Sequence, residues 1–121
     1  MGMKVYIAAP FNRREEARSA RNVLMKKGYV SVSRWIDNHL TEKISDQQKR
    51  TEALEDIKDI QKSMRMIFIN GKSTAGGMHV EMGYALSEGI PIYLVGKPSS
   101  VFHHLPQVTC FNCVEDIPNA Y

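Results

Sequence analysis

The sequence contains few residues of the kinds that cross-link small proteins or anchor them in membranes. Among 121 residues there are two cysteines, one tryptophan and five prolines. Two cysteines are too few for the disulfide framework that holds small secreted domains together. The apolar run in residues 3–11 is short and is followed directly by arginines, which excludes a typical signal peptide or membrane span. We therefore expect a cytoplasmic protein that has no membrane partner.

The residues that are present have the proportions of a globular protein. Hydrophobic residues make up 43% of the chain and charged residues 24%. The sequence has no repeat and no low-complexity tract, so nothing in it predicts disorder. A chain of this length buries a core without cross-links. We expect one domain, spanning residues 1–121.

The net charge is +3, with a pI near 8.9. The basic residues concentrate in the first helical segment: Arg13, Arg14, Arg18, Arg21, Lys26 and Lys27. Glu15 and Glu16 partly offset them. Such a run is typical of a solvated helix face. The alternative is a patch for an anionic ligand, for which a nucleotide phosphate fits better than duplex nucleic acid.

The two cysteines form a single CxxC motif at Cys110 and Cys113, with His103 and His104 upstream. This spacing allows a zinc site in principle. No second CxxC is present, and a reduced pair near a short strand is the alternative that a cytosolic protein favours.

Apolar runs rich in β-formers alternate with helical patterns along the chain. The predicted strands are residues 4–10, 29–35, 65–70, 90–96 and 108–111, and the predicted helices are residues 13–27, 47–63 and 78–89. This alternation predicts an α/β fold, a flavodoxin-like three-layer domain with a five-stranded, mainly parallel sheet in the order 2-1-3-4-5. The polar connection at residues 36–47 is longer than usual for such a link, and long loops often cover a site.

Ligands of such sheets bind at the carboxyl ends of the strands. The segments expected there are residues 8–12, 35–39, 70–77 and 96–104. The helix that follows the third of these segments is apolar almost all round, which predicts that it is buried. Its polar column consists of Glu81 and Glu88.

Glu81 lies about one turn beyond the Gly76-Gly77 pair, near the positive end of the helix dipole. That position helps a poorly hydrated carboxylate to stay ionised, and such a carboxylate is a nucleophile. The alternative is that glutamate is simply favoured in a first helical turn.

A second acid, Asp56, lies in the helix at residues 47–63. The apolar positions there are Leu54, Ile57, Ile60 and Met64. At roughly 100° per residue, Asp56 falls on the margin of this stripe and faces into the domain. Glu55, Lys58 and Asp59 are expected in solvent. The alternative for Asp56 is an ordinary surface aspartate.

These residues resemble the nucleoside 2-deoxyribosyltransferase family, whose superfamily also contains nucleoside 5'-monophosphate N-glycosidases. The matching segments are "KVYIAAPF" at 4–11, "EDIKDI" at 55–60, "GGMHVEMGYAL" at 76–86 and "PIYLVG" at 91–96. The similarity covers most of residues 3–97 and is most specific at the helix that carries Glu81.

The resemblance implies an enzyme that cleaves the N-glycosidic bond of 2'-deoxynucleosides through a glycosyl-glutamate intermediate and passes the deoxyribosyl group to another base. It implies that Glu81 is the nucleophile and that Asp56 helps the base to depart. It requires no metal and no cofactor. The alternatives are a 2'-deoxynucleoside 5'-monophosphate N-glycosidase, which is a hydrolase, and a non-catalytic nucleotide-binding module on the same fold.

The expected substrate contacts are Tyr6, Ala9, Phe11, Trp35, Gly76, Gly77, His79, Ser99 and Ser100. Trp35 is expected either to stack on the base or to anchor the core. His79 contacts the ligand or packs beside the helix start. Arg13 and Arg14 are expected either to pair with a phosphate of the substrate or to be neutralised by neighbouring acids. In the second case the substrate is a nucleoside and not a nucleotide.

The chain also departs from the family pattern. An acid that relatives often carry before the nucleophile is replaced by "STAGG", with Ala75 near its place, and Ser63-Met64 stands where "AD" is frequent. Members of the family use a neighbouring subunit to complete the pocket, and some end in a functional tyrosine. Tyr121 is the last residue of this sequence and has the corresponding position. Together with the apolar segment "SVFHHLP" at 100–106, this predicts a homodimer or a higher homo-oligomer.

Overall fold

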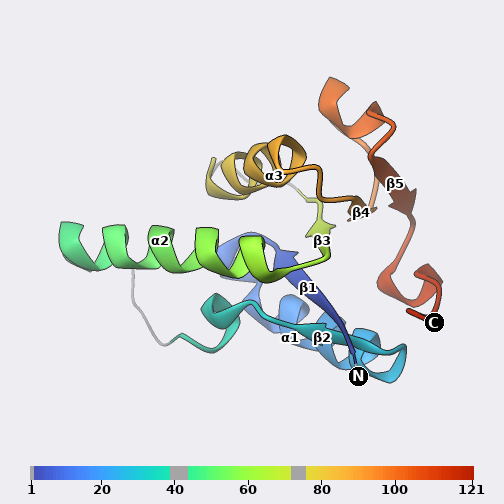
Figure 1. Ribbon diagram of the computed structural model, residues 1–121, viewed down its shortest axis with the longest axis horizontal. Coiled ribbons are helices and arrows are strands. Elements are labelled where there is room, and N and C mark those ends of the chain that lie inside the picture. The colour runs from blue at the N-terminus through green and yellow to red at the C-terminus, as the bar shows by residue number, and fades with distance from the viewer. Residues whose placement is uncertain (1, 39–43, 72–75) are drawn as a thin grey trace.

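A computed structural model describes residues 2–38, 44–71 and 76–121, and it shows five strands and three α-helices in these ranges (Figure 1). The strands are β1 (Met3–Ala8), β2 (Tyr29–Ser31), β3 (Arg65–Ile69), β4 (Ile92–Val95) and β5 (Val108–Phe111). The α-helices are α1 (Arg14–Lys26), α2 (Asp46–Lys62) and α3 (Gly77–Ser87), and the short 3-10 helices are η1 (Phe11–Arg13), η2 (Arg34–Asp37), η3 (Val101–His104) and η4 (Val114–Asp116). Two positions near the predicted site, His39 and Ala75, lie outside the described residues.

The predicted sheet is confirmed. Its order is β2-β1-β3-β4-β5, and all neighbouring strands are parallel. Tyr6 of β1 pairs with Met66 of β3, and Ala8 pairs with Phe68, so the carboxyl ends of these two central strands lie side by side. The segments that follow them therefore meet at the edge where parallel sheets bind ligands.

Helices cover both faces of the sheet (Figure 1). Tyr6 and Phe68 point toward α3, where they contact Glu81 and His79. Side chains alternate between faces along a strand, and Ile69 accordingly faces α1. The core lies between the layers and is built mainly from the strands, since the segments Val5–Ala8 and Met66–Phe68 are fully buried.

The prediction that the apolar stripe of α2 is buried against the domain is wrong. Leu54, Ile57 and Met64 are exposed, by 53%, 37% and 60%, and only Ile60 of the stripe is buried. Figure 1 shows the N-terminal end of α2 projecting beyond the sheet. Ile60, in the last turn of α2, is the stripe position that packs into the core.

The placement of Asp59 in solvent is also wrong. Its side chain is 1% exposed, and it is paired with Arg34 of η2. The Arg34 backbone N–H donates to Oδ2 at 3.1 Å, and its guanidinium Nε and Nη2 donate to Oδ1 at 3.0 Å. A buried carboxylate is tolerated when it is paired and hydrogen-bonded in this way. The pair ties η2 to α2.

Two further expectations need correction. Helix α3 is buried along one side only: Met78, Met82 and Ala85 face the sheet, while Val80 is 73% exposed, because α3 is an outer layer. Strand β2 ends at Ser31, four residues earlier than predicted. Beyond it the chain turns into η2, and the Ser33 hydroxyl accepts the Ile7 N–H at 2.7 Å.

The turn after β4 depends on a glycine. Gly96 has a φ of +114°, and a Cβ there would lie 3.3 Å from the carbonyl oxygen of Asn70. Both features disfavour any other residue. Gly96 thus lets the chain bend sharply beside the end of β3, which places the segment 97–100 at the ligand-binding edge.

Candidate active site

Tyr6 and Glu81 meet on the buried face of the sheet. Tyr6 is fully buried on β1, and its hydroxyl donates a hydrogen bond to Oε2 of Glu81 on α3. Burial raises the pKa of Tyr6 far above its ordinary range, and the charges of Glu81 and Asp56 raise it further. The phenol therefore stays protonated and acts as a donor that fixes the position of the Glu81 carboxyl group.

Asp56 completes an acidic cluster. It lies half-buried on α2, and it and Glu81 influence each other's pKa. Burial, and then repulsion from Glu81, raise the pKa of Asp56 to about 8. At neutral pH this carboxyl group therefore holds a proton. It is available as an acid, which is unusual for an aspartate.

The two carboxyl groups have different surroundings. Burial raises the pKa of Glu81 above its ordinary value, and hydrogen bonding with Tyr6 and then Asp56 offsets part of that rise. A proton shared by such a pair resides on the group whose charged form is less stabilised. Glu81 accepts the Tyr6 hydroxyl, and the pKa of Asp56 is raised to about 8, so we assign the negative charge to Glu81 and the proton to Asp56. Carboxyl groups whose pKa values are pushed apart in this way are suited to separate roles as nucleophile and acid.

The start of α3 is open. Gly76 and Gly77 are exposed, and a Cβ on either would meet no atom of the described residues within 4 Å. These glycines leave space at the helix start for another molecule. Glu81 is the fifth residue of α3 and bonds to a residue 75 positions away. Its place in the helix is thus not that of a first-turn capping glutamate.

The aromatic side chains near the end of β1 divide into a buried one and an exposed one. Trp35 is 7% exposed, and its Nε1–H donates to the carbonyl oxygen of Ile7 at 2.7 Å, as expected of a core anchor. Phe11 is 47% exposed, with its ring centroid 6.4 Å from that of Trp35. Ala9 is buried directly before this turn. Phe11 is therefore the more accessible of the two rings.

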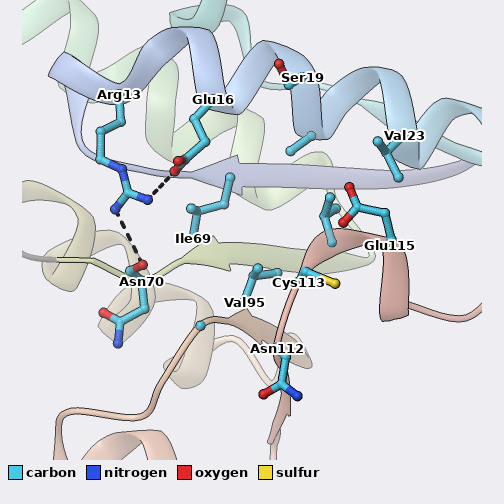
Figure 2. A pocket seen from close by; sticks show the side chains of 13 residues that line it. Arg13, Glu16, Ser19, Val23, Ile69, Asn70, Val95, Asn112, Cys113 and Glu115 are labelled. Carbon is cyan, nitrogen blue, oxygen red and sulfur yellow. Dashed lines mark hydrogen bonds and ion pairs between the residues drawn. The ribbon is translucent and has the colours of Figure 1, made fainter.

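The two arginines considered as phosphate ligands contact the protein itself. Figure 2 shows Arg13 between Glu16 and the carbonyl oxygen of Asn70. Arg14 donates to the carbonyl oxygen of Asn38, and its guanidinium lies 5.0 Å from the centre of the Phe11 ring. Both guanidinium groups have partners in the folded chain, which weakens the case for a phosphate at this position.

The loop after β4 forms a polar pocket of about 560 Å³ beside α3. It is lined by Asn70, Gly71, His79, Lys97, Pro98, Ser99 and Ser100. The Asn70 amide donates to the carbonyl oxygen of Lys97 at 2.6 Å and to the hydroxyl of Ser99 at 3.0 Å. His79 is exposed, and its ring lies 5.7 Å from that of Phe68. The pocket offers hydroxyl, imidazole and ammonium groups to a ligand.

From the sequence, His103 and His104 are both possible metal ligands, and the two are not distinguished. His103 is 1% exposed, and its Nδ1 accepts the backbone N–H of Ser99 at 3.0 Å. His104, its neighbour in the same short helix, is exposed. No sequence signal separates the two histidines, because their difference arises from how η3 packs against β3.

The cysteine motif lies apart from this cluster. Cys110 and Cys113 are both free and exposed, and His103 points its Nδ1 at the backbone. In the ranges 2–38, 44–71 and 76–121, no group of three or more His, Cys, Asp or Glu side chains is arranged to hold a metal ion. Within the same ranges, every helix is too short or too polar to cross a membrane.

Comparison with known proteins identifies the fold. No family model and no curated protein sequence matches the chain. Among solved structures, a 2-deoxyribosyltransferase from the psychrotolerant bacterium Bacillus psychrosaccharolyticus is similar with a TM-score of 0.80 and 21% identity, over 98% of this chain and 92% of that one. A Clostridium botulinum CMP N-glycosidase is similar with a TM-score of 0.62 and 21% identity, over 93% and 92% of the two chains.

A conserved protein from Enterococcus faecalis is similar as well, with a TM-score of 0.61 and 17% identity, over 86% of this chain and 71% of that one. Two of the three similar structures thus belong to enzymes that are named for nucleoside or nucleotide glycosyl chemistry. The resemblance expected from the residues around Glu81 is confirmed in the fold: this chain has the architecture of a 2-deoxyribosyltransferase and of a CMP N-glycosidase.

Proposed function

We propose that this chain is an enzyme that cleaves the N-glycosidic bond of 2'-deoxynucleosides and transfers the deoxyribosyl group to another base. The observation that carries the proposal is the buried cluster of Tyr6, Glu81 and Asp56, in which one carboxylate faces a protonated acid. The fold shared with a 2-deoxyribosyltransferase supports it. A binding protein gains nothing from two partly buried acids that raise each other's pKa at a cost in stability.

The first half of the reaction forms an ester. An oxygen of Glu81 attacks C1' of the sugar while the bond from C1' to the base nitrogen breaks through an oxocarbenium-like transition state. Asp56 gives its proton to the departing base, so that the base leaves without negative charge. Tyr6 donates to the second carboxyl oxygen and holds the attacking oxygen in line.

The second half reverses these steps with a new base. A nitrogen of the acceptor attacks C1', Glu81 departs as a carboxylate, and Asp56 takes up the acceptor's proton. Phe11 is the residue we assign to stacking on the base. Ser99 and Ser100 then face the sugar from the opposite side, across the start of α3. Water in place of the acceptor base gives hydrolysis, so exclusion of water decides between the two outcomes.

The test is an exchange assay with mass spectrometry. The protein is incubated with each 2'-deoxynucleoside, with and without a second free base, and the products are separated chromatographically. Transfer gives a new nucleoside, and without an acceptor the peptide that contains Glu81 gains one deoxyribosyl group. Glu81→Gln should give neither the new nucleoside nor the labelled peptide. Glu88→Gln, which changes an exposed glutamate of the same polar column, is the matched control. Binding without any product would identify a non-catalytic module.

The polar pocket beside α3 favours a second candidate, hydrolysis of a 2'-deoxynucleoside 5'-monophosphate. Its Lys97, Ser99 and His79 present donors that suit a phosphate, while Arg13 and Arg14 are engaged elsewhere. The structural similarity to a CMP N-glycosidase is consistent with this alternative.

Saturation kinetics on a deoxynucleoside and on its monophosphate separate the two candidates. A preference above about 100-fold for the monophosphate, lost in Lys97→Ala and kept in Lys26→Ala, would establish the hydrolase, since a charged hydrogen bond contributes roughly 1.5–3 kcal/mol. Comparable values for the two substrates, with transfer to a second base, support the transferase.

A further inference from the structure

His103 holds the loop that lines the polar pocket. Its imidazole is buried under the loop, and Nδ1 accepts the backbone N–H of Ser99 at 3.0 Å. Asn70 also attaches this loop, since it donates to the Lys97 carbonyl and the Ser99 hydroxyl. The next residue, Ser100, accepts the His103 backbone N–H at its carbonyl oxygen and the Phe102 N–H at its hydroxyl. Two side chains from different elements therefore fix the same short segment, Asn70 from the end of β3 and His103 from η3.

The hydrogen bond determines where the imidazole carries its proton. Because Nδ1 accepts, the neutral ring is protonated at Nε2. That nitrogen is buried and has no hydrogen-bond partner among the described residues. Burial lowers the pKa of His103, and the nearby His79 and His104 lower it further, so the ring is neutral at pH 7.

A histidine is an unfavourable choice for packing at this position. The ring contacts Phe68, with centroids 5.7 Å apart, in a setting where an apolar side chain would leave no unpaired donor. What the imidazole supplies, and an apolar side chain does not, is the acceptor for Ser99. Its contribution is therefore to the shape of the loop.

We propose that His103 is a positioning residue for substrate recognition, which holds Ser99 and Ser100 where they contact the sugar or its 5' substituent. The inference rests on the proposed function only for the identity of that ligand. The hydrogen bond from Ser99 to His103 is what places the loop, and its loss weakens substrate binding more than it slows the chemical step at Glu81.

Two substitutions separate this role from packing. In His103→Asn, the amide oxygen replaces Nδ1 as the acceptor, whereas His103→Leu fills the space without an acceptor. His104→Asn is the matched control, because His104 is exposed in the same short helix. The first measurement is amide hydrogen exchange at Ser99, which needs no substrate. It should stay slow in the wild type, in His103→Asn and in His104→Asn, and become at least about tenfold faster in His103→Leu.

The second measurement compares the effects of the substitutions on KM and on kcat. His103→Leu should raise KM about tenfold with little change in kcat, and His103→Asn should restore KM. In the wild type, KM should also rise at acidic pH, below the ordinary pKa of histidine, because a protonated Nδ1 no longer accepts, and this rise should be absent in His103→Asn. The titratable groups that face His103 are His79 on α3, His104 on η3, and Cys110 on β5, whose Sγ donates to the His103 carbonyl oxygen at 3.9 Å.

The outcomes for His103 and for the proposed function are distinguishable. A wild-type protein that turns over no nucleoside or nucleotide contradicts the proposed function, and Ser99 exchange then decides the role of His103 alone. Unchanged Ser99 exchange in a folded His103→Leu protein overturns the positioning role, and so does an unchanged KM in an active one. Faster exchange together with a KM that His103→Asn restores supports it.

Discussion

Asp56→Asn should stabilise the protein and impair the reaction. The structure gives Asp56 a pKa of about 8 in the folded protein, against an ordinary value of 3.8. Between these two values the folded state binds one more proton than the unfolded state, so stability falls as the pH rises. Asparagine has nearly the same shape and takes up no proton. The variant therefore avoids this loss.

The size of the change in stability follows from the shift in the pKa of Asp56. One proton taken up on folding changes stability by at most about 1.4 kcal/mol per pH unit, which gives an upper bound of about 4 kcal/mol between pH 4 and pH 7. Asp56 is only half-buried, and water screens part of this energy. We expect Asp56→Asn to gain about 1–2 kcal/mol at pH 7 and almost nothing at pH 4.

Urea unfolding of both proteins at several pH values measures this difference. Asp59→Asn is the contrasting control on the same helix, because it removes the charge of a buried carboxylate that pairs with Arg34 and should make the protein less stable than the wild type. A variant Asp56→Asn that is less stable than the wild type at pH 7, or a difference that does not change with pH, would refute the proton on Asp56. The same variant should lose roughly 10²–10⁴-fold in rate, because the departing base then receives no proton.

Three further predictions concern the same site and its surroundings. Glu81→Gln should keep the fold, checked by circular dichroism, and lose at least about 10³-fold in rate; a folded variant with normal turnover would rule out the covalent mechanism. Tyr6→Phe should lower kcat about 10–100-fold and move the acidic limb of the pH profile upward, because the hydrogen bond from Tyr6 lowers the pKa of Glu81. Val101 and Phe102 are 79% and 61% exposed, and we expect them to contact a second copy of the chain, so Phe102→Asp should dissociate a dimer in sedimentation experiments. An active wild-type monomer at micromolar concentration would contradict this expectation.

The strands and their order were predictable because the signal is local. Buried parallel strands are continuous apolar runs, as in residues 66–69, and the chirality of crossover connections leaves few possible orders. The exposed faces of the helices were not predictable in the same way. The periodicity of α2 predicts which residues share a side, but only the tertiary packing shows that Leu54 and Ile57 stay exposed while Ile60 is buried.

The residues of the candidate site also differ in how far the sequence predicts them. Glu81 and Asp56 stand out in the sequence because each is an acid beside apolar residues in a helix. Tyr6 lies inside a strand where a buried tyrosine is ordinary, and its hydrogen bond spans 75 positions. The same applies to Asp59, whose burial depends on Arg34, 25 residues away. Such contacts are set by the tertiary packing, which no local pattern encodes.

The charge arrangement around Asp56 links the two steps of the proposed reaction. Asp59 lies one helical turn away, but its charge is balanced by Arg34, so the pKa of Asp56 depends first on burial and next on the charge of Glu81. When Glu81 attacks C1' and becomes a neutral ester, that second cause disappears, and the pKa of Asp56 falls. Asp56 thus becomes a stronger acid as negative charge develops on the departing base. When the ester is cleaved, the charge returns to Glu81, and Asp56 again becomes basic enough to hold the acceptor's proton.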